Sequence, residues 1–114
     1  MNTEIDRKIA VIFVADVVGY SKHMKKDEDN TLKSFKSCKK ILDRLFEEHG
    51  GLIFNTAGDS ILAEFTSAVS AVVCASEFQK LIKQRNASVE EISQMHFPQY
   101  HLLNLDNLNY LIYL

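Results

Sequence analysis

Cysteine is scarce in this chain of 114 residues, which contains only Cys38 and Cys74. The two lie far apart and match no spacing that is used by zinc sites or redox motifs. Both fall at apolar positions of expected helices. We therefore expect buried free thiols in a reducing compartment.

Long hydrophobic runs and a strong net charge are also missing. The apolar run behind the charged start "MNTEIDRK" is only about nine residues long. It is too short to span a bilayer, and no small-residue cleavage site follows it. The formal net charge of -2 gives no general attraction to nucleic acid or to an acidic membrane. These features predict a cytoplasmic protein without a nucleic-acid or membrane partner.

Lysine and arginine are absent after Arg85. Residues 1–85 hold all 13 of these cations, whereas residues 86–114 hold only three acids. The segment "PQYHLLNLDNLNYLIYL" draws 13 of its 17 residues from Leu, Asn, Tyr and Ile. This change in composition predicts one unit over residues 1–86 and a tail over residues 87–114.

The first unit shows a clear sequence of expected elements. A β-branched run apolar on both faces predicts a central strand. Apolar residues at three- and four-residue steps predict long helices, and short apolar runs on both sides of a glycine predict a hairpin. The expected strands are 8–18, 52–56 and 60–65, and the expected helices are 20–26, 27–51 and 67–86. The order β-α-α-β-β-α predicts an α+β, ferredoxin-like (split β-α-β) sandwich.

Two acids stand where chemistry could occur. Asp16 ends the first strand, and Asp59 follows Gly58 at the hairpin tip. This topology can bring both carboxylates to one end of the sheet, where a magnesium or manganese ion would relieve their repulsion. The turn that contains Gly19 offers successive backbone N–H groups for phosphate oxygens. The alternative is that Asp16 only accepts turn hydrogen bonds and that the hairpin is only a hairpin.

Three segments resemble the class III adenylate/guanylate cyclase catalytic domain of bacterial type. "IAVIFVADVVGYSKHM" resembles the first strand and metal turn of that family, with the pattern D-[IVM]-x-G-[FY]-[ST]. "EEHGGLIFNTAGDSILAEF" resembles the hairpin that carries G-D, and "SAVSAVVCASEFQKLIKQRN" resembles the helix after it. The resemblance covers roughly residues 7–86, the N-terminal half of the domain only.

The resemblance assigns roles to individual residues. It implies that two magnesium or manganese ions are held by the carboxylates of Asp16 and Asp59 and by the backbone carbonyl of Val17. It also implies that four residues hold the β- and γ-phosphates through backbone N–H groups, and these are Val18, Gly19, Tyr20 and Ser21. The implied reaction converts a nucleoside triphosphate to a cyclic nucleotide and pyrophosphate.

The sequence departs from the family at two places. Asn55 occupies the base-specificity position, where adenylyl cyclases carry Lys and guanylyl cyclases carry Glu, and its uncharged amide does not decide which base is bound. ATP is favoured over GTP only because the overall sequence resembles bacterial adenylyl cyclases more. Nothing in the tail matches the strand, second base-recognition residue and transition-state Asn and Arg that follow in the family. We therefore identify no catalytic residue beyond the metal ligands. We expect a tail that is out of frame or disordered, a domain truncated after the second long helix, and an exposed edge on the first strand. The alternative is that the tail stands in as a surrogate strand, since Leu103, Leu105 and Asp106 partly alternate.

Three hypotheses follow from these observations. The chain is a cyclase domain that is inactive alone, because the class III site forms between two catalytic domains, in a homodimer or with a complete cyclase chain. Alternatively, it is a non-catalytic remnant that binds a nucleotide or dimerises, or it is a degenerate gene product. The DNA beyond the stop codon tests the truncation: a downstream frame without a cyclase-like second half would contradict a frameshift.

Overall fold

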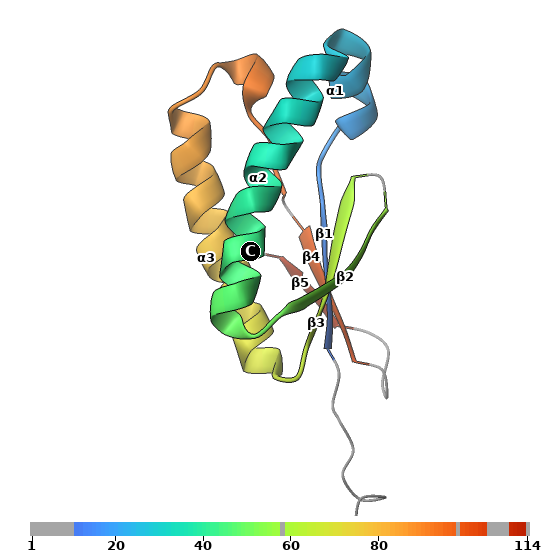
Figure 1. The fold of residues 1–114 in the computed structure, drawn as a ribbon, viewed down its shortest axis with the longest axis vertical. Helices are drawn as coiled ribbons and strands as arrows, with labels where there is room; N and C mark the ends of the chain where they lie inside the picture. Colours follow the sequence, from blue (N-terminus) through green and yellow to red (C-terminus); the bar gives the residue numbers. More distant parts are fainter. Residues whose placement is uncertain (1–10, 58, 98, 105–109, 114) are drawn as a thin grey trace, which may run out of the picture.

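The chain forms one antiparallel sheet with two long helices packed on one face (Figure 1). The computed structural model describes residues 11–57, 59–97, 99–104 and 110–113. Its elements, in chain order, are β1 (Val11–Asp16), α1 (Tyr20–Lys26), α2 (Glu28–His49), β2 (Leu52–Ala57), β3 (Ser60–Phe65), α3 (Ala68–Ala87), the 3-10 turn η2 (Glu91–Ser93), β4 (Gln99–Asn104) and β5 (Tyr110–Tyr113). The six elements predicted up to the end of α3 are confirmed, and residues 8–10 of the expected first strand lie outside the described residues.

The strand order β2-β3-β1-β4-β5 places β1 at the centre of the sheet. β1 pairs antiparallel with β3 on one side and with β4 on the other. The first four positions of this order are those of a ferredoxin-like sandwich, which confirms the predicted fold class. The sequence could anticipate this because β1 is apolar on both faces, as strands inside a sheet usually are.

Local signals fix the ends of α2. The Asp27 side chain accepts a hydrogen bond from the backbone N–H of Asn30 at 3.0 Å and caps the first turn. Glu28 and Asp29 add negative charge where the helix dipole favours it. Gly50 ends the helix with φ 77°, a left-handed conformation that glycine adopts without steric cost.

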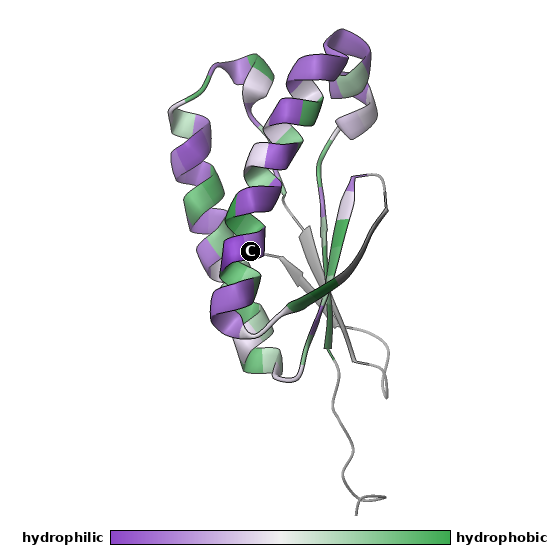
Figure 2. Ribbon diagram, viewed as in Figure 1, coloured by the Kyte–Doolittle hydropathy of each residue, from purple (hydrophilic) through white to green (hydrophobic). Residues whose placement is uncertain are grey.

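The core lies between the sheet and the two long helices. Alternate residues of β1 point inwards, so the Phe13 ring packs against the rings of Phe46 and Phe65, with centroids 5.3 and 6.0 Å apart. Phe78 brings α3 into the same core. Figure 2 shows hydrophilic and apolar residues alternating along both long helices, as expected for helices with one solvated face. None of the helices in the described part of the chain is long and apolar enough to cross a membrane.

Both cysteines are buried free thiols, as predicted. Burial in the apolar core raises the pKa of Cys38 to about 11, and the nearby charge of Arg85 lowers it in part. Burial also raises the pKa of Cys74 to about 12, with further increases from the negative charges of Glu77 and Glu48. Neither thiol is therefore ionised near neutral pH, and the thiolate is the reactive form.

We expect both thiols to resist modification in the folded protein. Dithionitrobenzoate should label neither Cys38 nor Cys74 on the timescale of minutes at pH 7.5, and both should react once urea unfolds the chain. Absorbance of the released thiolate measures the labelling. Rapid labelling of either cysteine without denaturant would contradict the burial of its side chain.

The segment after α3 packs into the domain instead of leaving it. We call residues 88–97 the strap. Met95 and Phe97 of the strap are each 1% exposed, and the Phe97 ring lies 5.0 Å from that of Phe78. The expectation of a disordered tail is therefore wrong for the strap, because these apolar side chains complete the core.

Asn86 fastens the strap to the end of α3. Its side-chain amide donates to the Met95 carbonyl at 2.7 Å and accepts from the Met95 N–H at 3.2 Å. Gln94 donates to the Asn86 carbonyl, and Arg85 donates to the Ser93 carbonyl. Asn86 is only 7% exposed, so this two-way pairing also satisfies a buried amide that would otherwise be costly.

β4 covers the edge of β1 that was expected to be exposed. Residues 11–15 of β1 pair with residues 100–104 of β4, and β5 adds a further strand outside β4. The expected exposed edge and the expected end of the sheet after α3 are thus both wrong for the described residues. The physical reason is that the unpaired N–H and C=O groups of a central strand require partners, and the tail supplies them. Of the tail positions thought to alternate, Leu103 lies in β4, and Leu105 and Asp106 lie outside the described residues.

Candidate functional site

The two acids singled out in the sequence lie at the same end of the sheet. Asp16 is the last residue of β1 and stands opposite Ser60, the first residue of β3. Asp59 precedes Ser60, and its backbone carbonyl accepts a hydrogen bond from the Val17 N–H at 3.4 Å. The antiparallel pairing of β1 with β3 therefore brings Asp16 and Asp59 together from distant parts of the chain.

Both carboxylates are half-buried at this sheet end. The Ser60 hydroxyl donates a short hydrogen bond to Oδ1 of Asp16, which orients that carboxylate. A carboxylate retains further lone pairs when it accepts one hydrogen bond, so Asp16 could still bind a cation. Carboxylate oxygens of this kind are the hard ligands that magnesium and manganese prefer, so the donor set fits such an ion.

The turn after β1 leads directly into α1. Gly19 caps α1 with φ 65°, and no atom lies within 4 Å of the place where a Cβ would stand. Glycine is thus needed here for its backbone conformation, and the space beside it is open to a ligand. The Tyr20 ring packs against Phe35 of α2 with centroids 5.7 Å apart, which holds the start of α1 in place.

The backbone N–H groups of this turn are not equivalent. The Val18 N–H donates to the carbonyl of His96 in the strap at 2.9 Å, so a phosphate contact through Val18 would have to replace this bond. The N–H groups of Tyr20 and Ser21 belong to the first turn of α1, where a helix offers no internal acceptor. No sequence pattern indicates the His96 contact, because it joins two backbone groups from segments that are distant in the chain.

A shallow hollow of about 270 Å³ lies beside the turn. Its lining includes Gly19 and the side chains of Lys22, His23 and Lys26. Cations at the rim of a hollow raise the local concentration of anions. The basic stretch at the start of α1 therefore faces the same space as the glycine turn.

Asn55, the base-specificity position suggested by the sequence, lies in β2. Its backbone pairs with Leu62 of β3, next to a shift in register between Ile53 and Asn55. The placement of its side chain lies outside what the structure describes.

Comparison with known proteins relates the sequence and fold of the chain to nucleotide cyclases. The chain is 40% identical over 88 residues to the curated protein named "Putative adenylate cyclase 3" of Rhizobium meliloti (strain 1021). It is also 31% identical to a solved adenylate/guanylate cyclase/hydrolase from Silicibacter pomeroyi, with a TM-score of 0.68 over 84% of the chain and 55% of that structure. The chain is therefore homologous, over most of its own length, to proteins named as adenylate or guanylate cyclases. No family model matches the chain.

The chain spans only part of the length of the relatives it matches. The matched region is 76% of the chain but only 15% of the Rhizobium protein. The guanylyl cyclase Cya2 superposes with a TM-score of 0.72 at 17% identity, over 92% of the chain and 62% of that structure. Because 92% of 114 residues is about 105, the likeness in fold to Cya2 includes part of the tail beyond residue 86.

Proposed function

We propose that this cyclase homologue supplies the metal- and phosphate-binding half of a nucleotide cyclase site. The proposal rests on the position of Asp16 and Asp59 at the same end of the sheet, where β1 pairs with β3. The glycine turn at the start of α1 follows directly after this end of β1. The substrate proposed is a nucleoside triphosphate. Its products are a cyclic nucleotide and pyrophosphate, formed when the ribose 3′-oxygen bonds to the α-phosphorus and the bond to pyrophosphate breaks.

The residues of this half-site have distinct tasks. Asp16, Asp59 and the Val17 carbonyl would hold two magnesium or manganese ions, which when bound offset phosphate charge and favour ionisation of the 3′-hydroxyl. Gly19, Tyr20 and Ser21 would hold the β- and γ-phosphates through backbone N–H groups. Ser60 orients the Asp16 carboxylate, and the hydrogen bond between Val18 and His96 fixes the start of the turn.

The second half of the site would come from another chain. We propose that a complete cyclase chain is the partner that completes the site. A homodimer would join two metal-binding halves without the complementary half, so this chain alone should have little or no activity. Positioned groups that stabilise the charge of a transition state typically supply several kcal/mol, so a site without them would be very slow. Asn55 does not decide between the bases, and we favour ATP over GTP because the sequence is more similar to a protein named as an adenylate cyclase than to the guanylyl cyclase Cya2.

Complementation between two chains tests this function. We expect no cyclic AMP from the purified chain with ATP and manganese. We expect activity when it is co-expressed with a full-length cyclase whose own metal-binding aspartate has been replaced by asparagine. Asp16→Asn in this chain should abolish that activity, whereas Asp29→Asn, at an exposed position of α2, should not. Cyclic AMP measured by mass spectrometry reads the result.

The outcomes separate the proposal from its main alternative. Co-purification with the cyclase without any restored activity would favour a dimerisation remnant. Cyclic AMP production by the chain alone, lost in Asp16→Asn, would show that the second half is not required. Restoration that persists in Asp16→Asn would contradict the role of this carboxylate.

A further inference from the structure

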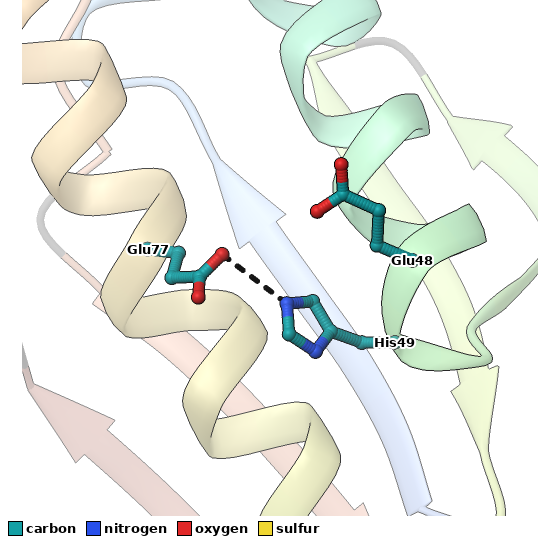
Figure 3. Close-up of side chains that lie close together, drawn as sticks. All are labelled: Glu48, His49 and Glu77. Atoms are coloured by element: carbon teal, nitrogen blue, oxygen red, sulfur yellow. Dashed lines mark hydrogen bonds and ion pairs between the residues drawn. The ribbon is translucent and has the colours of Figure 1, made fainter.

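A second group of side chains that could bind a metal ion lies away from the nucleotide half-site. Glu48 and His49 occupy the last turn of α2, and Glu77 lies on the facing side of α3 (Figure 3). This group lies towards the end of the helix layer opposite to the β1–α1 turn (Figure 1). One ligand atom from each residue lies within 4.8 Å of the other two.

The spacing is close to that of a metal site. Nε2 of His49 and Oε2 of Glu77 are 3.2 Å apart. Zinc binds imidazole nitrogen and carboxylate oxygen at about 2.1 Å, which at a tetrahedral angle separates two ligands by about 3.4 Å. Glu48 is exposed, so a change of rotamer can bring its carboxylate closer without disturbing the core.

The charge of the group favours a cation. With neutral imidazole, the two carboxylates of Glu48 and Glu77 carry two negative charges. Within the described residues no Lys or Arg nitrogen lies within 4.0 Å of either carboxylate, and Nε2 of His49 contacts Glu77 alone. Glu48 also lies at the C-terminal turn of α2, where the helix dipole disfavours an anion and favours a cation.

A buried thiol beneath the group is a separate observation. Cys74 lies one helical turn before Glu77 on α3, is 0% exposed and is free. Its pKa is raised first by burial and then by the negative charges of Glu77 and Glu48. Cys74 itself is not one of the three residues whose ligand atoms lie together.

We propose that Glu48, His49 and Glu77 bind a divalent transition-metal ion of the zinc class, which ties the end of α2 to α3. An imidazole nitrogen with two carboxylates suits zinc, and water completes the coordination. The same set does not suit magnesium, which takes oxygen ligands in a near-octahedral arrangement. This proposal is independent of the proposed cyclase function, because it uses none of the residues of the nucleotide half-site.

Zinc titration of the full chain tests the site. The background carries Asp16→Asn and the buffer contains excess magnesium, so that the nucleotide half-site does not contribute. Isothermal titration calorimetry should give one zinc per chain, and zinc should raise the melting temperature. Glu77→Gln and His49→Gln should each weaken zinc binding at least tenfold, since removing a ligand costs at least as much as removing a group behind it.

Glu47→Gln is the matched control, because it removes the same charge from the neighbouring exposed position of α2. It should bind zinc as the background protein does. Equal zinc affinity in all variants would mean adventitious binding elsewhere, and no binding to the folded background protein would also overturn the proposal. Circular dichroism in EDTA checks that each variant folds. Because two ligand variants are tested, the result does not depend on one variant that fails to fold.

Discussion

Asp16→Asn is expected to weaken manganese-dependent binding of a nucleoside triphosphate by more than about 100-fold, since loss of even a group that only hydrogen-bonds to a metal ligand typically costs 10–100-fold in metal affinity. Asp16 holds its carboxylate at the end of β1 beside Asp59, and asparagine keeps the shape of the side chain but removes its charge. Fluorescence anisotropy of a labelled ATP analogue measures the binding. Asp29→Asn, at an exposed position of α2, is the matched control and should bind as the wild type does.

In EDTA, the same measurement should show no loss of triphosphate binding in Asp16→Asn. Without a metal ion, the carboxylates of Asp16 and Asp59 repel an anionic triphosphate, so Asp16→Asn should bind it no more weakly than the wild type. A variant that loses binding equally with manganese and in EDTA would point to damage at the phosphate turn instead. Unchanged binding with manganese would contradict the assignment of Asp16 as a metal ligand.

The first half of the fold could be predicted because its signals are local. Caps such as Asp27 and the stop at Gly50 are encoded within a few residues of the helix they bound. The approach of Asp16 to Asp59 followed from topology, because a β-α-α-β-β-α chain has few ways to form an antiparallel sheet. For this half of the chain, the identity and order of the side chains were sufficient to predict the elements and their arrangement.

The remainder depends on contacts between distant backbone groups. The hydrogen bond from the Val18 N–H to the His96 carbonyl joins two backbone groups and requires no particular residue type. No sequence pattern therefore predicts it. The tail alternates only in part, so a strand there was the less favoured alternative. The place of β4 is set by the open edge of β1 and not by its own pattern. The group of Glu48, His49 and Glu77 was missed because only the packing of α2 on α3 brings it together.

Removing the tail should have the largest effect on stability. A chain that ends at residue 86 loses Met95 and Phe97, which are each 1% exposed. Burial of a Met or Phe side chain is worth about 1.5–3 kcal/mol, and each hydrogen bond between the Asn86 amide and Met95 contributes about 0.5–1.5 kcal/mol. Small domains have only about 5–15 kcal/mol in total, so we expect this chain not to fold.

Chains cut at two later positions separate the strap from the strands. A chain ending at residue 97 keeps Met95 and Phe97 but leaves one edge of β1 unpaired, so it should retain helical circular dichroism and self-associate. A chain ending at residue 109 loses only β5 and should stay closest to the full chain. Urea unfolding and sedimentation velocity measure the two effects. If the chain ending at residue 86 unfolded cooperatively at the same urea concentration as the full chain, the tail would not belong to the folded domain.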